Sequence, residues 1–488
     1  MNNMSSLVDT LTASGGTESA EYSGFLNDII AQLWPNINVA GCKMIKDIVE
    51  PIFKSTLPGP LSSLYFSKLD LGPVPMHLSR VDVHKTEKEG IKLDVDLDWN
   101  GKSDIELDGH IVPKMGIEHI KLRGRFSVLL CPLTNIIPLI GALQVAFINP
   151  PTLKLEFTDA ISIAELDIIE RAIKKVILNI LGGMLVLPNR MLVKLDPRND
   201  WFKTYVPHVG IIRLTISAAT GIQPHKKSGA KRLLQKLVKD VPDCYCNIAV
   251  GASEAWRTKT SKDQHDPVWD ETHDFLVMDH DQVISIDVND DDLGDDDDIG
   301  EATTTTRQIL LEGGTQELKL VHKGQETDAR VKIHAKFYEL VADADSLAPA
   351  EGGGDGGEGL FAGLATVLIA SAHGLEGDHR QLNPSVRISF GSGREFNTVA
   401  KTYTEGMDIF NPAFDTAFQI PLTAADVAAT DGVFKIALMD KAVEIGGCEV
   451  SFQEVKDAEG MLLEKGFDVG KGATVRASFS LRGMRLAT

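Results

Sequence analysis

The strongest restriction on the fold of this chain comes from a long segment without charge. Residues 126–153, FSVLLCPLTNIIPLIGALQVAFINPPTL, contain no Asp, Glu, Lys or Arg and are long enough to cross a bilayer as a helix. Pro132, Pro138 and Gly141 interrupt the segment, and a helix facing lipid would have to satisfy the backbone groups freed at each break. The sequence therefore favours an irregular apolar surface inside a folded domain over a transmembrane helix.

Patterned helices and strands surround this segment. Two helical patterns precede it, EYSGFLNDIIAQLWP and NVAGCKMIKDIVEPIFKS, and a third follows it, with Ile173 and Ile177 on a broad apolar face that ends at Gly182-Gly183. The run IKLDVDLDWNG alternates apolar residues with Lys and Asp, which predicts a strand with one apolar and one acidic face. Its apolar residues include Leu93, Val95, Leu97 and Trp99. Together these patterns predict an α+β domain with a long antiparallel sheet.

The rest of the chain has an all-β pattern in two parts. The first part runs from about Trp201 to Leu340, and VADADSLAPAEGGGDGGEG then has the composition of a flexible linker. The second part begins near Leu360, where GLATVLIASAHGL is similar to GIIRLTISAATGI at 210–222. This similarity indicates a repeated domain.

Composition excludes several classes of protein. With 488 residues, 43% apolar and 24% charged, the chain has room for about three folded domains. A formal net charge of −20 argues against a general nucleic-acid binder, which needs a dense Lys and Arg surface. Five scattered cysteines indicate neither a disulfide framework nor a zinc site, and the N-terminus lacks the pattern of a signal peptide.

The acidic run DVNDDDLGDDDDIGE, residues 287–301, follows a predicted strand. Asp290 and Asp292 stand two residues apart and would point the same way, and Asp296 or Asp297 would close around an ion. Calcium prefers six to eight oxygen ligands, so a crowded turn of carboxylates suits it. An EF-hand loop fails on spacing, because Ile and Thr occupy two of its ligand positions. A solvated acidic loop is the alternative.

A basic and apolar stretch, HKKSGAKRLLQKLVKDVPD, precedes this region. Its lysines interleave with leucines, so basic and apolar faces would separate on a short helix. Such a helix could pack its leucines on a sandwich, or it could anchor the chain to an anionic membrane. The second hypothesis predicts membrane contacts by Lys231, Arg232, Leu233, Leu234, Lys236 and Leu237.

Residues 20–196 resemble the lipid-binding SMP domain of extended synaptotagmins, tricalbins and plant synaptotagmins. The resemblance rests on FLNDIIAQLWPNINVAGCKMIKDIVEPIF, on PLIGALQVAFINPP and on VLPNRM, which ends at Met191. It implies a tubular, TULIP-like fold whose apolar groove holds glycerophospholipid and which pairs as a homodimer. An ordinary apolar core is the alternative for each residue. The predicted lipid-facing positions are Leu93, Val95, Leu97, Trp99, Ile137, Leu139, Val145, Phe147, Ile173 and Ile177.

The two all-β parts resemble C2 domains, which are β-sandwiches whose loops meet membranes. In the first, VPDCYCNIAVG, HDPVWDETHDF and the acidic run match the family pattern, although Leu237 stands where a first-loop aspartate belongs. The second part has Asn383 and Phe414 at two motif positions, and we predict no calcium there. The resemblance implies a calcium site in the first domain formed by Asp240, Asp243, Asp290, Asp292, Asp296 and Asp297.

These features predict a multidomain chain of an SMP domain followed by two C2 β-sandwiches. The expected units are a disordered 1–19, an SMP-like 20–197, a first C2 domain at 205–341, a linker at 342–359 and a degenerate second C2 domain at 360–486. The resemblance implies a carrier of phospholipid that docks on anionic membranes with calcium. The alternative is a calcium-regulated tether without transfer.

Enzymatic activity is not expected, because the sequence contains no GxSxG nucleophile motif. The resemblance also implies a location on the cytosolic face of membranes, at contacts between the endoplasmic reticulum and the plasma membrane. Extended synaptotagmins carry a membrane hairpin before the SMP domain, whereas about 20 polar residues precede it here and no transmembrane segment is visible. Three explanations fit that difference: an N-terminal anchor is missing from this sequence, a partner recruits the chain to the endoplasmic reticulum, or the chain is a soluble carrier.

Overall fold

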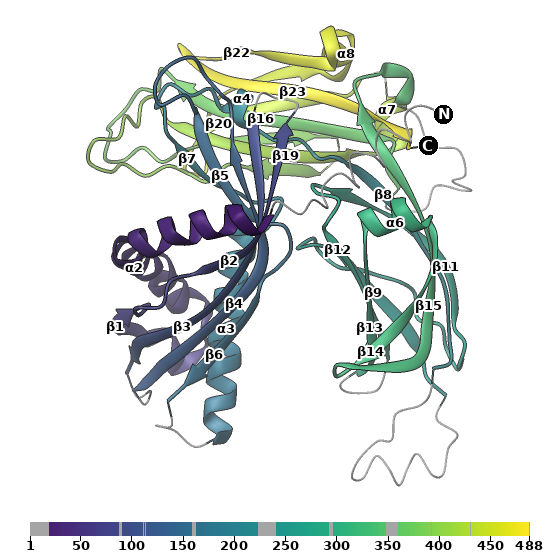
Figure 1. The fold of residues 1–488 in the computed structure, drawn as a ribbon. Coiled ribbons are helices and arrows are strands. Elements are labelled where there is room, and N and C mark those ends of the chain that lie inside the picture. Colours follow the sequence, from purple (N-terminus) through teal and green to yellow (C-terminus); the bar gives the residue numbers. More distant parts are fainter. Residues whose placement is uncertain are drawn as a thin grey trace.

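The computed structural model consists of an N-terminal domain and two β-sandwiches (Figure 1). Within the residues that the structure describes, no helix combines the length and the apolar character that crossing a membrane requires. The described residues are 19–86, 90–110, 112, 114–158, 163–222, 241–291, 296–347, 360–391, 393–429 and 431–487.

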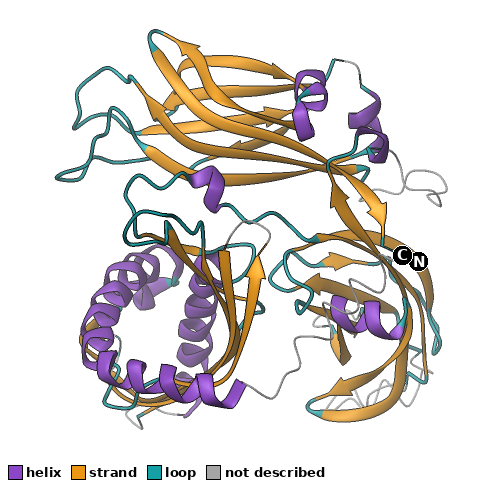
Figure 2. Cartoon of the chain, turned by 45° about the horizontal axis from the view of Figure 1, so that its top comes forward, coloured by secondary structure: helices purple, strands orange, loops and turns teal. Residues whose placement is uncertain are grey.

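The N-terminal domain is a curled antiparallel sheet with two long helices across its open side (Figure 2). The main strand order is β1-β3-β4-β5-β7, with β2 paired to β3 and β6 paired to β4. Its elements are α2 (Ser19–Thr56), η1 (Gly59–Ser63), β1 (Tyr65–Asp70), β2 (His77–Thr86), β3 (Gly90–Asp108), β4 (Met115–Leu130), β5 (Ala142–Phe147), β6 (Thr152–Phe157), α3 (Ile163–Leu185) and β7 (Met191–Lys194).

The three predicted helices differ in extent from the structure. The two predicted N-terminal helices are one element, α2, which continues through Pro35 and Pro51. Proline lacks a backbone N–H and crowds the preceding turn, so it bends a helix without always ending it. Helix α3 likewise continues through Gly182 and Gly183. A Cβ at either glycine would meet nothing within 4 Å, so packing does not require these glycines.

The uncharged segment forms strands and a loop. It supplies the end of β4, the loop at 131–141, all of β5 and the start of β6. Prolines at 132 and 138 cannot donate to a strand ladder, which explains why the middle of the segment leaves the sheet. The prediction that this segment does not form a transmembrane helix is therefore confirmed by its secondary structure.

The first sandwich follows a short connecting helix, α4 (Trp201–Thr204). Its buried core combines Ile, Val and Leu side chains from alternating strand positions. Its elements are β8 (Gly210–Thr220), β9 (Cys244–Val250), β10 (Trp256–Arg257), β11 (Val268–Val277), β12 (Val283–Asp290), β13 (Asp297–Thr305), α6 (Thr306–Glu312), β14 (Thr315–His322) and β15 (Gln325–Val341).

The second sandwich continues one sheet of the first. Strand β15 pairs antiparallel with β23, from Tyr338 beside Leu486 to Val341 beside Gly483. Backbone hydrogen bonds therefore cross from one sandwich to the other. Its elements are η2 (Ala344–Ser346), β16 (Gly363–His373), β17 (Pro384–Phe390), β18 (Arg394–Asn397), β19 (Ala413–Leu422), α7 (Ala424–Ala428), β20 (Val433–Asp440), β21 (Val443–Ser451), α8 (Phe452–Asp457), η3 (Glu459–Met461), β22 (Leu462–Gly470) and β23 (Ala473–Leu486).

The N-terminal domain contacts the first sandwich through its acidic strand face. Lys92 Nζ lies 3.0 Å from Asp94 Oδ2 on the same strand and 2.6 Å from Asp279 Oδ2 of the first sandwich. Asn149 Nδ2 donates to the carbonyl oxygen of Asp281 at 2.8 Å, and its Oδ1 accepts from Val283 N at 2.7 Å. These polar contacts are largely shielded from water, so they fix how the two units are placed.

The second sandwich also contacts the N-terminal domain and α4. Lys194 Nζ at the end of β7 lies 2.5 Å from Asp415 Oδ2 of β19. Arg476 Nη2 donates to Asp200 Oδ2 at 2.9 Å, beside the buried rings of Phe202 and Tyr205. The end of the N-terminal sheet that carries β5 and β7 therefore lies against the second sandwich (Figure 1).

Candidate functional site

One face of the curled sheet directs apolar side chains toward the helices. Strand register places Val128 of β4 beside both Leu93 of β3 and Val145 of β5. Phe126 lies two residues before Val128, so it projects from the same face, and its ring lies 6.1 Å from that of Phe147. Because α2 and α3 close the open side of the sheet (Figure 2), these side chains face the interior of the domain.

Side chains fill only one part of the interior between the sheet and the two helices. Val95, Leu97 and Trp99 are buried in the core, where Trp99 contacts Trp34 with 5.5 Å between the rings. An apolar side chain that faces inward and still touches solvent has unfilled space beside it, and such space suits an acyl chain. The half-buried inward-facing side chains are Leu93, Phe126, Val128 and Val145.

A further apolar stripe runs along the N-terminal part of α2. Phe25, Ile29 and Leu33, spaced one helical turn apart, are exposed, while Leu26 and Ile30 pack against the core. The apolar arc of this helix is therefore wider than its packing needs. The helical spacing of these apolar residues is visible in the sequence, but the sequence does not show which of the side chains stay exposed.

The positions predicted to contact lipid fall into three groups. Those fully packed in the core are Val95, Leu97, Trp99, Phe147 and Ile173. Those half-buried in the interior are Leu93, Val145 and Ile177. Ile137 and Leu139 lie elsewhere, exposed on the loop between β4 and β5. The sequence analysis did not single out Phe126 and Val128, because a run without charge hides which residues alternate.

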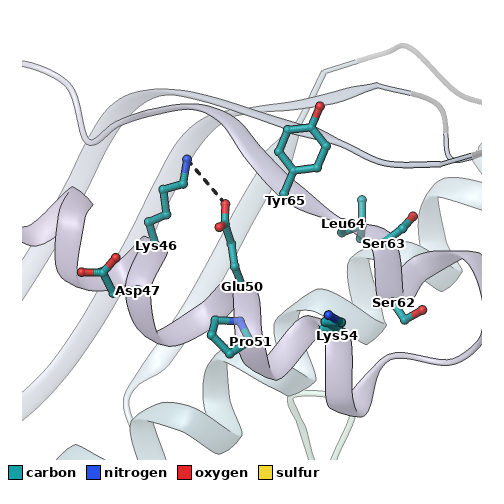
Figure 3. Close-up of a pocket in the computed structure, with 9 residues that line it drawn as sticks. All are labelled: Lys46, Asp47, Glu50, Pro51, Lys54, Ser62, Ser63, Leu64 and Tyr65. Carbon is teal, nitrogen blue, oxygen red and sulfur yellow. Dashed lines mark ion pairs between the residues drawn. The ribbon is translucent and has the colours of Figure 1, made fainter. Parts of the chain in front are cut away.

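An open hollow of about 810 Å³ lies outside the sheet, beside η1 and the turn of α2 at Pro51 (Figure 3). Lys46 and Glu50 on its wall are 3.8 Å apart, and Glu50 Oε1 also accepts from Phe66 N at 2.8 Å. Lysines and carboxylates stand around it in equal number, so the hollow has no net charge to select an ion. It is separate from the apolar interior face.

Aspartates gather at one end of the first sandwich, where β9 and β13 begin and β12 ends. Asp243 N donates to Asp290 Oδ1 at 2.7 Å, and Asp243 Oδ1 accepts from Asp263 N at 2.8 Å. Strand register places Asp297 directly beside Asp290. The structure thus brings together Asp243, Asp290 and Asp297 of the predicted calcium ligands.

The remaining carboxylates at this end have protein partners or are not described. Asp296 Oδ2 accepts from the Tyr245 hydroxyl at 2.6 Å. Within the described part of the chain, no group of three or more acidic, His or Cys side chains has a geometry that would hold a metal. Asp240 and Asp292 lie outside the described residues, as do the predicted membrane contacts Lys231, Arg232, Leu233, Leu234, Lys236 and Leu237.

The negative charge of the aspartates at this end of the sandwich also affects buried side chains. The pKa of the Cys244 thiol is raised to about 12, first by burial and then by the charges of Asp290 and Asp243. Burial also raises the pKa of Asp287, together with the charges of Glu301 and Asp298. A divalent cation would relieve this repulsion, so the residues at this end fit calcium in charge and in their oxygen donors.

The second sandwich has an amide at the corresponding place. Asn383 N donates to Asp440 Oδ1 at 2.8 Å, the same contact that Asp243 makes with Asp290. The Asn383 side chain then donates to the Lys401 carbonyl and to Thr402 Oγ1, both at 3.0 Å. The Asn383 side chain thus presents an N–H donor at the position where a carboxylate oxygen could bind a cation.

Comparison with known protein families divides the chain into the same three parts as the structure, one N-terminal domain and two β-sandwiches. The model of the synaptotagmin-like mitochondrial-lipid-binding domain matches residues 16–196, and the C2 domain model matches residues 210–321 and 363–465. Extended synaptotagmin-1 of Mus musculus is 25% identical over 465 residues, which cover 92% of this chain and 40% of that protein. Extended synaptotagmin-2 of Mus musculus is 25% identical over 490 residues, which cover 96% of this chain and 55% of that protein.

A solved structure has the same fold over nearly the whole chain. The structure of the SMP domain and two C2 domains of extended synaptotagmin 2 matches with a TM-score of 0.64 and 21% identity, covering 96% of this chain and 100% of that one. The predicted fold class is thereby confirmed. The chain spans between two fifths and just over half of the two curated relatives named above. It consists of an SMP domain followed by two C2 domains and is homologous to the extended synaptotagmins.

Proposed function

We propose that this chain carries glycerophospholipid in its SMP domain between two membranes that it also tethers. The observation that carries the proposal is the row of inward-facing, half-buried apolar side chains, among them Leu93, Phe126, Val128 and Val145. Each acyl methylene buried there would contribute about 0.8 kcal/mol. The headgroup would remain near water, where its charge needs no protein partner.

Docking on an anionic membrane is assigned in this proposal to the first C2 domain. Asp243, Asp290 and Asp297 would hold calcium, and Asp240, Asp292 and Asp296 stand close in the sequence as further ligands. Bound calcium would supply the positive charge that lets this acidic end approach lipid phosphates. The basic residues at 231–236 would add to that attraction.

Three finer points belong to the same proposal. By homology, two SMP domains would pair as a homodimer and lengthen the apolar path. The chain would act on the cytosolic face of the endoplasmic reticulum, at its contacts with the plasma membrane. The second C2 domain, with Asn383 in place of an acidic ligand, would contact lipid or protein without calcium.

A tether without transfer is the second candidate function. It is favoured by the buried positions Val95, Leu97 and Trp99, which pack as an ordinary core does without a ligand. In that case the half-buried side chains beside them would be a loosely packed part of the same core. The amount of lipid that remains bound to the protein distinguishes the two functions.

The test is native mass spectrometry of lipid bound to the full chain. Val128→Trp with Val145→Trp would fill the interior across β4 and β5, and Leu311→Trp on the exposed face of α6 is the matched control. We expect about one or more phospholipids per chain in the wild type and the control, and at least a tenfold loss in the folded double variant. A wild-type chain without lipid would refute the carrier function and leave the tether.

A further inference from the structure

The loop that joins β4 to β5, residues 131–141, is here called the tip loop. It extends from the end of the SMP sheet where Lys194 also contacts Asp415 of the second sandwich, and it contains no charged residue. Four of its five large aliphatic side chains are exposed to solvent, with exposed fractions of 38% for Leu133, 56% for Ile136, 88% for Ile137 and 54% for Leu139. Such a group of exposed aliphatic side chains is unusual on a monomer and marks a contact surface.

The tip loop has a defined shape, because its backbone is tied across its own base. Thr134 N donates to the Leu139 carbonyl at 2.8 Å, and Gly141 N donates to the Pro132 carbonyl at 2.8 Å. Leu139 has a φ of +73°, a left-handed conformation that leucine rarely adopts. The loop therefore holds its apolar side chains outward.

A cation and further apolar surface lie at the base of the tip loop. The carbonyl of Lys203 accepts from Cys131 Sγ at 3.6 Å, and the Lys203 side chain is exposed. Leu195 N donates to the Gly141 carbonyl at 3.0 Å, and the Leu195 side chain is 41% exposed. The nearby Asp196 carboxylate is neutralised by Arg198 at 3.2 Å. An apolar projection with a lysine at its base fits the interface of an anionic bilayer.

The apolar surface of the tip loop continues into the SMP interior. Leu130 and Leu143 pair at the point where the loop leaves the sheet. On each strand the side chain two residues further from the loop, Val128 and Val145, projects from the same face. These four apolar side chains therefore extend from the base of the tip loop to the half-buried part of the interior. None of the four carries a charge, so they could contact an acyl chain.

We propose that the tip loop inserts its isoleucine and leucine side chains into the facing leaflet of a bilayer and opens the SMP interior toward that leaflet. A bilayer suits this surface better than a second copy of the chain does. A stable protein interface needs about 20 to 30 residues a side with matching shape, whereas the tip loop is short and projecting. The inference deepens the proposed carrier function, but membrane insertion would occur whether or not lipid is carried.

The test uses the full chain and vesicles of phosphatidylcholine with phosphatidylserine, in chelator so that calcium binding does not contribute. Ile136→Ser with Ile137→Ser should weaken vesicle binding by about tenfold or more, because two exposed aliphatic side chains are lost. Leu311→Ser, which removes an exposed leucine from α6 of the first sandwich, should leave binding unchanged. Equal binding by the wild type and the double variant would overturn the proposal, as would a wild type that does not bind these vesicles.

A second measurement reports on the position of the tip loop directly. In an Ile137→Trp variant, the emission of the added tryptophan should shift to shorter wavelength when the protein binds vesicles, and brominated acyl chains should quench it. Both changes should exceed those of the wild type, which reports on the native tryptophans alone. Emission that stays unquenched on vesicle-bound protein would refute insertion. If the double serine variant loses only self-association, measured by light scattering, the tip loop contacts a second copy instead. Bound lipid measured by mass spectrometry tests the carrier function independently of these outcomes.

Discussion

At Asp94, two opposing effects decide the charge of the carboxyl group. Burial disfavours ionisation, but hydrogen bonds from His84 and Lys92 and the charge of Lys92 outweigh it and lower the pKa to about 2. In the unfolded chain the same group titrates near its ordinary value of 3.8. Because the folded pKa is the lower one, Asp94 stabilises the fold above about pH 4, and this contribution disappears as the pH falls through 2.

The pH dependence of an Asp94→Asn variant follows from that shift. We expect the free energy of unfolding to fall by about 2 kcal/mol at pH 7 and by little near pH 2. Urea unfolding at several pH values measures the difference. Asp98→Asn, on the same strand but in the exposed pair with Arg123, should cost less than about 1 kcal/mol at every pH. A constant difference between wild type and Asp94→Asn from pH 2 to pH 7 would contradict the assignment.

At the scale of elements, three strand ends meet to form the acidic end of the first C2 domain. Asp290 ends β12, Asp297 begins β13 and Asp243 precedes β9, so repulsion among their carboxylates is built into the sandwich. If calcium binds there, its binding free energy adds to the stability of the folded state. At a hundredfold excess over Kd that gain is about 2.7 kcal/mol.

Thermal unfolding with and without calcium tests this site. Calcium should raise the Tm of the wild type, and Asp290→Asn should abolish most of the rise while increasing the Tm in chelator, because repulsion falls. Asp440→Asn is the matched control, since Asp440 accepts from Asn383 N as Asp290 accepts from Asp243 N. The site would be ruled out if calcium stabilised the Asp290→Asn variant as much as the wild type.

Periodicity predicted the elements better than it predicted their boundaries. The alternation of Leu93, Val95 and Leu97 with charged residues correctly predicted β3, because each face of that strand meets a different environment. The uncharged segment has no such contrast, so sequence alone could not show that Val145 returns to the interior while Ile137 projects from a loop. Contacts between domains, such as Lys92 with Asp279, have no local pattern at all.

At the scale of the whole molecule, charge fixes the SMP domain against the first C2 domain. Lys92 stands between Asp94 and Asp279 and is mostly shielded from water, so removing its charge would leave two buried carboxylates without their partner. Burial works against the charge of Lys92, yet the two carboxylates outweigh it and raise the pKa of the ammonium group. The lysine therefore stays charged throughout the physiological pH range.

Reversing that charge should separate the two domains. We expect Lys92→Glu to weaken their contact by about 3 kcal/mol, to increase the radius of gyration in small-angle scattering and to expose the connection at 197–209 to protease. Lys102→Glu makes the same charge change at an exposed position of β3 and should have neither effect. Identical scattering curves for the two variants would show that other contacts hold the domains together.

The strand pair that joins the two C2 domains also decides where each of them can face. Strand β15 reaches the junction with its C-terminal end, and its first residues lie toward the acidic end of its own sandwich. Strand β23 also reaches the junction with its C-terminal end but runs in the opposite direction, so the matching loops of the second sandwich lie beyond its far end. The two sets of loops therefore lie at the ends of the joined strands that are farthest from the junction. A surface bound by one set is thus separated from the other set by the combined length of both sandwiches.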